Sequence, residues 1–138
     1  MWALNKKAMS LLIGIHINET LAASEAIVRK VCDRVFPIVA PAGVEDYPYI
    51  VYQSSTQPAE TTKDGVLFDN VATSVTIVSK SYGEAVALAH DVRLALESRP
   101  DIEYERFEVY GVTYEGSSEM WLDDIAAYAV ELSFSFLT

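Results

Sequence analysis

A β-α unit in the middle of the chain constrains the fold more than any other part of this sequence. Residues 71–78 are rich in β-branched side chains, and one side of an extended chain would carry Val71, Thr73, Val75 and Ile77. Before this run, Asp64-Gly65 is typical of a tight turn, because glycine accepts positive φ without a steric penalty. The pattern predicts a strand that follows a turn and buries one face.

A helix is predicted directly after this strand. The sequence Ser81-Tyr82-Gly83-Glu84 matches a capping box, in which the Ser81 hydroxyl accepts from the Glu84 amide and the Glu84 carboxylate bonds back to the Ser81 amide. Over residues 82–97 the apolar side chains share one helical stripe, and they are Ala85, Leu88, Ala89, Val92 and Leu96. Charged residues face away from it, namely Glu84, Asp91, Arg93 and Glu97. Pro100 prevents further helix.

Two helices are expected near the N-terminus. Residues 3–17 form the first, with an apolar stripe of Leu4, Ala8, Leu11, Leu12 and Ile15. Ser24 can cap a short second helix whose apolar side holds Ile27, Val28 and Val31. Lys6-Lys7 and the apolar run after it also allow a signal peptide, but Gly14 and His16 interrupt that run. An exported protein that has lost residues 1–23 is therefore only an alternative.

Three further strands complete the predicted sheet. Residues 47–53 and 104–113 form two of them, the second with impure alternation. The last strand has the cleanest pattern, with Tyr128, Val130, Leu132, Phe134 and Phe136 on one face. Residues 38–40 are extended between Pro37 and Pro41. The prediction is an α+β fold: an antiparallel sheet of about four strands, with two N-terminal helices and one long helix (about 82–97) packed on one face.

Two long connections are predicted between these strands. Residues 54–63 are polar and rich in threonine, so their tip is expected to project from the sheet. Residues 115–126 are acidic but hold Met120, Trp121 and Leu122. These three side chains either cover the core or contact a neighbouring subunit, because exposed tryptophan and methionine are enriched at interfaces.

The overall charge excludes one broad class of function. The 138 residues carry a net charge of −10 and are expected to form one domain, residues 1–138. Binding of nucleic acid through phosphate neutralisation requires clustered Lys and Arg, and anionic membranes require the same. The single cysteine, Cys32, excludes an internal disulfide, and its apolar neighbours predict a small buried side chain. No segment has the length of apolar sequence that a membrane span needs.

The residues that could support catalysis or metal binding do not form a recognisable pattern. Of the two histidines, His16 lies among apolar residues and His90 beside Asp91, and neither is paired with a nucleophile by spacing. Asp123-Asp124 is most simply a solvated acidic loop, since adjacent residues rarely converge on one ligand. We therefore predict a protein that is not an enzyme and has no catalytic residues, cofactor or metal. A small-molecule-binding domain that uses His90, Asp91 or Asp123-Asp124 stays open as an alternative.

The order of several motifs resembles a known family. Arg34-Val35-Phe36-Pro37 is followed by Ala40-Pro41 and by Tyr47-Pro48-Tyr49-Ile50-Val51-Tyr52-Gln53. The strand Val75-Thr76-Ile77-Val78 then leads to Ser81-Tyr82-Gly83-Glu84-Ala85 and the long helix. From about residue 8 to residue 138, this order is similar to the tail-completion, or tail-terminator, proteins of long-tailed bacteriophages and prophages. The extra N-terminal residues and residues 117–124 depart from the family pattern.

The resemblance implies a structural role in the virion. Members of this family form a ring, usually a hexamer, at the head-proximal end of the tail, where they stop growth of the tail tube and meet the head–tail connector. Self, tail-tube protein and connector are the implied partners, DNA passes through without specific binding, and synthesis takes place in the bacterial cytoplasm. A head–tail connector component is the related alternative. The interface residues that we predict are Thr56, Gln57, Thr61, Lys63, Met120, Trp121 and Leu122.

Overall fold

The computed structural model describes residues 10–58, 69–99 and 101–138. In chain order the elements are the 3₁₀-helix η2 (Ser10–Leu12), α1 (Ile13–Ala22), α2 (Glu25–Val31), β1 (Val35–Pro37), β2 (Tyr49–Pro58), β3 (Asp69–Ser79), α3 (Tyr82–Glu97), β4 (Ile102–Glu103), β5 (Glu108–Val109), β6 (Gly111–Leu122) and β7 (Ala127–Leu137). Within these ranges no helix is both long and apolar enough to cross a membrane.

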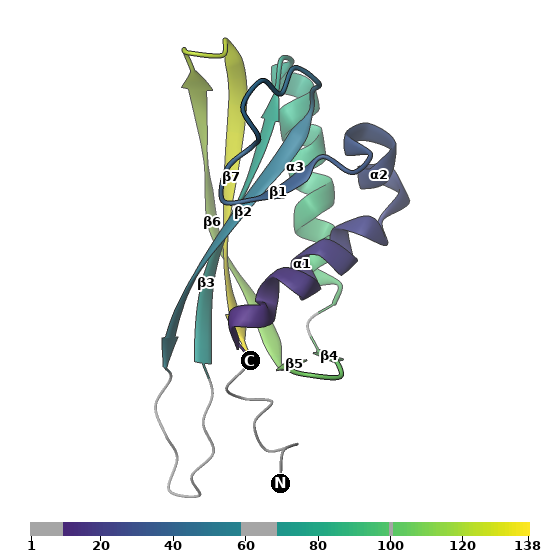
Figure 1. Cartoon of the computed structure of the whole chain (residues 1–138), viewed down its shortest axis with the longest axis vertical. Helices are drawn as coiled ribbons and strands as arrows, with labels where there is room; N and C mark the ends of the chain where they lie inside the picture. Colours follow the sequence, from purple (N-terminus) through teal and green to yellow (C-terminus); the bar gives the residue numbers. More distant parts are fainter. Residues whose placement is uncertain (1–9, 59–68, 100) are drawn as a thin grey trace, which may run out of the picture.

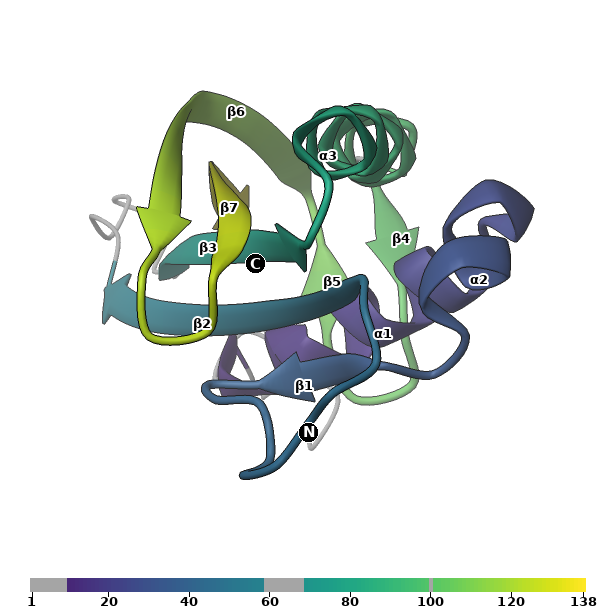
Figure 2. The same ribbon diagram turned by 90° about the horizontal axis from the view of Figure 1, so that it is seen from above.

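The strands form one large sheet with the helices on one side of it (Figures 1 and 2). The strand order is β1-β2-β3-β7-β6, and every neighbouring pair is antiparallel except β1 and β2, which are parallel. Strands β4 and β5 form a separate small sheet. The α+β prediction is confirmed, but the main sheet has five strands rather than about four and is mixed rather than purely antiparallel.

The main core lies between the sheet and the three helices. The predicted stripe of α3 is buried as expected, and so is the predicted face of β3. On β7, Val130, Leu132, Phe134 and Phe136 are buried, whereas Tyr128 is 36% exposed. Arg93 of α3 lies over the Tyr114 ring of β6, 3.7 Å from its centroid. We call the sheet face turned away from the helices the outer face.

The N-terminal cap of α3 differs in one bond from the predicted capping box. Ser81 Oγ accepts from the Glu84 amide at 3.4 Å, as expected. The Glu84 carboxylate instead accepts from Ser79 Oγ at 2.7 Å, and Ser79 Oγ also accepts from the Ser81 amide at 3.1 Å. Because Ser79 ends β3, one buried hydroxyl fixes the junction between the strand and the helix.

The N-terminal helix and Cys32 differ from their predictions. The part of residues 3–17 that the structure describes forms η2 and α1, which continues to Ala22, while residues 3–9 lie outside the described ranges. The side that packs on the core holds Ile13, His16, Ile17, Thr20 and Leu21, whereas Leu11 and Ile15 are 81% and 41% exposed. Cys32 is exposed rather than buried; it is the C-cap residue of α2 and has φ 56°. On α2, Ile27 and Val31 are buried but Val28 is 38% exposed.

Both predicted long connections contain residues that belong to strands. Residues 54–58 continue β2 and pair with residues 69–73 of β3, so only residues 59–68 separate the two strands. Residues 115–122 continue β6 and pair with β7, which leaves a turn of residues 123–126. The predicted strand over 104–113 is β5 and the start of β6 with a loop before them. Residues 38–40 lie outside β1, and Ile38 has φ 69°.

Candidate functional site

The residues considered for catalysis lie apart in the folded chain. His16 is fully buried, and its Nδ1 lies 2.8 Å from the Tyr104 hydroxyl. Burial, with a smaller effect of the Arg99 charge, lowers the pKa of His16 to about 4. His90 is exposed on α3. Among the residues that the structure describes, no group of three or more His, Cys, Asp or Glu side chains could hold a metal ion.

The two acidic candidates line different hollows. Asp91 lines a hollow between α3 and the α1–α2 corner, together with Thr20, Ser24 and Arg99. Asp124 lines a groove on the outer face, and Asp123 is exposed on the same turn. Asp91 and Asp124, which the alternative of a small-molecule or enzymatic site invoked, therefore do not share one site.

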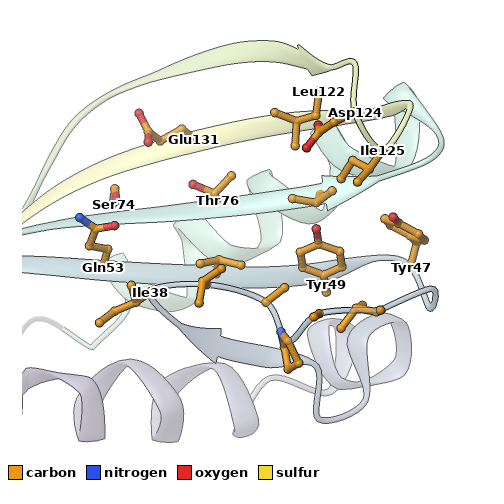
Figure 3. A pocket seen from close by; sticks show the side chains of 18 residues that line it. Ile38, Tyr47, Tyr49, Gln53, Ser74, Thr76, Leu122, Asp124, Ile125 and Glu131 are labelled. Carbon is orange, nitrogen blue, oxygen red and sulfur yellow. The ribbon is translucent and has the colours of Figure 1, made fainter.

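A groove lies on the outer face of the sheet, next to the β6–β7 turn (Figure 3). It has a volume of about 480 Å³, and its floor is formed by β2, β3 and β7 with Gln53, Ser74, Thr76 and Glu131. The β1–β2 connection borders one side, and the β6–β7 turn closes one end with Leu122, Asp124 and Ile125. Lys80 Nζ donates to the carbonyls of Ile125 and Ala126, the latter at 3.3 Å, and lies 4.7 Å from the centroid of the Tyr47 ring. This lysine links the turn to Tyr47, which precedes β2.

A second, smaller core lies at the same end of the outer face. Tyr49, Val78, Ala127 and Ala129 are buried there, partly under Leu122 and Ile125. The pKa of the Tyr49 hydroxyl is raised by burial and, to a smaller extent, by the nearby Tyr47 and Asp124. Leu122, one of the predicted interface residues, therefore contributes to packing within the chain.

The other predicted interface residues on β6 point to opposite sides of the sheet. Met120 is 40% exposed on the outer face, beside Ala129 of β7. Trp121 is 51% exposed on the helix side, opposite Tyr128. Thr56 is half-buried in β2, opposite Val71, and Gln57 pairs with Asn70. Thr61 and Lys63 lie outside the described residues.

Trp121 belongs to an exposed aromatic cluster that the sequence reading did not identify. We define this aromatic cluster as Tyr82, Trp121 and Tyr128. Tyr128 lies edge-on to both other rings, with centroid distances of 5.6 Å to Tyr82 and 5.0 Å to Trp121. The Tyr82 hydroxyl donates to the Glu119 carboxylate at 2.9 Å, and this bond, followed by the charge of Glu119, raises the pKa of Tyr82. The available signal was a turn after Leu122, because a hairpin loop of four residues (123–126) places Trp121 opposite Tyr128.

A second exposed apolar surface lies at the other edge of the sheet. Ile38 and Val39, directly after β1, are 69% and 70% exposed. Large exposed apolar side chains that neighbour each other are typical of contact surfaces. The chain thus carries two such surfaces, on β6 and after β1, at opposite ends of the strand order.

Comparison with known proteins gives one family and a set of solved structures. The model of the family "Tail completion protein gp17" matches residues 17–137. Nineteen chains of solved structures match, one of them described as "Virion of native gene transfer agent (GTA) particle". That chain has a TM-score of 0.73 and 15% sequence identity over 88% of this chain and 90% of its own, so the likeness concerns the fold. No curated protein matches.

Proposed function

This chain belongs to the tail completion protein gp17 family, and from that membership we propose that it forms a ring that ends the tail tube and joins it to the head connector. Membership makes it a structural protein of a phage-type tail, located in the virion and in contact with other virion components. The observation that carries the proposal is the extent of the match. Residues 17–137 include all the α-helices and strands apart from the first residues of α1, and they end where β7 ends, at Leu137.

The surfaces of the fold support self-association into a ring. The exposed apolar residues lie at opposite ends of the strand order, on β6 and directly after β1, so one copy presents two different contact surfaces. Contacts between two different surfaces of identical subunits are head-to-tail and generate rings when the rotation closes. We propose six copies, and contacts that include Thr56, Gln57, Met120, Trp121 and Leu122. Thr61 and Lys63 stay predictions, because they lie outside the described residues.

The proposal also covers domain organisation, enzymatic activity, the passage of DNA and the location of the protein. The chain acts as one structural domain, residues 1–138, with no enzymatic activity. Its net charge of −10 favours passage of DNA over retention, because acidic side chains repel phosphates. The head-proximal end of the tail is its proposed position, and synthesis takes place in the host cytoplasm.

Particle production without this protein tests the proposal. Loss of a tube-ending ring is expected to give tails of uncontrolled length that carry no heads, seen by negative-stain electron microscopy, with both defects restored by the supplied chain. Tails of normal length that lack heads would favour the connector alternative. Tails of normal length with heads attached would overturn the proposal.

The mass of the purified chain in solution gives an independent measurement. Light scattering across protein concentration is expected to detect a species of about six chains, either alone or after addition of tail-tube protein. A chain that stays monomeric with the tail-tube protein and does not bind it would contradict a ring on the tube.

A further inference from the structure

Two stretches at opposite edges of the large sheet have no strand beside them among the described residues. On one edge, β6 is the last strand and is 12 residues long. On the other edge, β1 pairs only with residues 50–52 of β2, so residues 53–58 continue without a strand on that side. Unpaired N–H and C=O groups along a strand edge are a template for another strand.

The chain leaves the β2 edge abruptly at Ile38. The Ile38 amide donates to the Tyr52 carbonyl at 2.7 Å, and the Val39 amide donates to the Pro37 carbonyl at 2.7 Å. This second bond spans two residues around Ile38, which has φ 69°, so the turn is a γ-turn of the strained kind. A β-branched residue in that conformation costs on the order of 1–3 kcal/mol. The turn frees the edge of β2 from Gln53 onward and leaves Ile38 and Val39 exposed beside it.

The edge of β6 is regular and unprotected after its bulge. The register with β7 shifts between Tyr114 and Gly116, and pairing is continuous from there to Leu122. Edge strands are usually protected by lysine or proline, and β6 contains neither. Residues 117–121 are all exposed. The regular part of β6 is therefore seven residues long (116–122), close to the six free residues of β2 (53–58).

We propose that these two edges pair between neighbouring copies of the chain, with residues 116–120 of one copy added to residues 53–57 of the next. The inference rests on the self-assembly proposed above and names its contact. Strands β2, β3, β7 and β6 alternate in direction, so β6 is antiparallel to β2. A neighbour related by rotation within a ring keeps that direction, and the junction is consequently antiparallel and continues the sheet.

The side chains determine the register of the pairing. Residues opposite each other on paired strands point to the same face of a sheet. Ser55 lines a hollow on the outer face, and Ser118 is opposite Glu131, which lines the outer groove. A register that places Ser55 opposite Ser118 puts both side chains on the outer face, near the middle of both segments. It places Met120 opposite Gln53 and brings Trp121 to the exposed Ile38 and Val39 of the neighbouring copy.

The geometry of this register suits a closed ring. Within one copy, Ser55 of β2 pairs with Ala72 of β3, which pairs with Ser135 of β7. Ser118 of β6 pairs with a different residue of β7, Glu131. The offset from Ser135 to Glu131 is roughly 14 Å along the strands, over four strand spacings that sum to roughly 19 Å. The ratio corresponds to a strand tilt of about 36°, within the 35–45° of closed barrels.

Charge does not oppose this contact, although the whole chain is acidic. Residues 53–58 contain no charged side chain, and residues 116–122 contain only Glu119. The Glu119 carboxylate accepts from the Tyr82 hydroxyl of its own chain. The two segments can therefore approach each other without bringing two of their carboxylates together.

Disulfide cross-linking tests the contact and its register. In a Cys32→Ser background, the pair Ser55→Cys and Ser118→Cys is expected to give a ladder of covalent multimers from oxidised assembled tails, because opposite residues fall within disulfide range. The matched control is Ser54→Cys with Ser118→Cys, which places the thiols on opposite faces of the same edges and is expected to give none. Each single substitution is expected to give no ladder beyond a dimer.

The outcomes separate this inference from the proposed function. Tails of normal length with heads attached, but with no cross-link specific to the Ser55/Ser118 pair, would overturn the edge contact and leave the proposed function intact. A wild-type measurement does not depend on the variants: hydrogen exchange within residues 53–57 and 116–120 is expected to slow at least about ten-fold on assembly. Unchanged exchange at both edges in the assembled protein would also overturn the inference.

Discussion

Trp121 and Tyr128 face each other across the β6–β7 hairpin, with ring centroids 5.0 Å apart and planes at 69°. The pair lies on the helix side of the sheet, where Tyr82 of α3 meets Tyr128 from the other direction. About half of the Trp121 side chain is exposed nevertheless. The hairpin therefore holds this tryptophan in a fixed position and leaves much of its surface free for a partner.

Replacing Trp121 by alanine is expected to weaken assembly more than folding. An exposed edge-to-face pair contributes about 1 kcal/mol to the free energy of unfolding, whereas a buried tryptophan at an interface contributes about 2 kcal/mol or more to binding. Chemical denaturation of the monomer and incorporation into tails measure the two effects. Leu94→Ala is the control, since Leu94 is 52% exposed on α3, away from both sheet edges. Equal loss of incorporation in both variants would contradict the prediction.

Replacing Ile38 by glycine is expected to leave the free energy of unfolding within about 1 kcal/mol of wild type. Glycine accepts the φ of 69° without strain, and this gain offsets its greater entropy in the unfolded chain. Ile38→Asp keeps the exposed position but introduces a charge, so it is expected to block assembly while the glycine variant only weakens it. Sedimentation of the assembled species compares the two. Normal assembly of Ile38→Asp would show that this residue does not meet a neighbour.

Acid is expected to destabilise the fold through His16. The pKa of His16 is about 4 in the folded chain against an ordinary value of 6.5, so the unfolded chain takes up the proton first as pH falls. The stabilisation is complete above about pH 6.5 and is lost between pH 6.5 and 4, amounting to about 1–2 kcal/mol at pH 5. Urea denaturation at pH 7 and pH 5 measures this loss.

The variant His16→Gln separates this histidine from the many carboxylates. It removes the titrating ring and keeps a polar group near the Tyr104 hydroxyl. The difference in unfolding free energy between pH 7 and pH 5 is expected to shrink by about 1–2 kcal/mol relative to wild type. An unchanged difference would mean that His16 does not titrate with a lowered pKa.

Ser79 is expected to contribute more to stability than Ser81, although Ser81 is the N-cap residue of α3. The Ser79 hydroxyl is buried and forms two hydrogen bonds, to the Glu84 carboxylate and from the Ser81 amide. Ser79→Ala is expected to cost about 2 kcal/mol, because it leaves the Ser81 amide and the Glu84 carboxylate each without a part-buried hydrogen bond. Ser81→Ala removes one exposed bond of 3.4 Å and is expected to cost about 1 kcal/mol or less. Thermal unfolding of both variants gives the order, and a larger loss for Ser81→Ala would contradict it.

The elements predicted correctly are those with one buried face and local end signals. Strand β3, helix α3 and strand β7 show their periodicity because one side of each meets the core. The prediction was less successful for β6, where residues 117–121 are all exposed and the period of two disappears. The polar end of β2 was read as a loop for the same reason. An edge strand that is exposed on both faces shows no alternation of apolar and polar residues, so it is difficult to predict from its sequence.

The contact candidates were predicted by residue type rather than by position. Met120, Trp121 and Leu122 were expected either to cover the core or to contact a neighbour. Met120 and Trp121 are exposed, on opposite faces of β6, whereas Leu122 packs within the chain. Tyr82 and Tyr128 were assigned to a cap and to a buried face, although both belong to the aromatic cluster. Their meeting depends on how α3 crosses the β6–β7 hairpin, which no short stretch of sequence contains.

By itself, the sequence determined the fold class, the α3 unit and the family resemblance, because these depend on local periodicity, capping residues and the order of motifs along the chain. Only the tertiary structure decided which edges of the sheet stay open, which face of β6 each apolar residue occupies, and that His16 is buried. These features depend on pairing between residues far apart in the chain, such as Val35 with Ile50 and Trp121 with Tyr128. The side-chain pattern within one strand cannot specify whether a further strand lies beside it, because hydrogen bonding at a sheet edge involves the backbone, which all residues share.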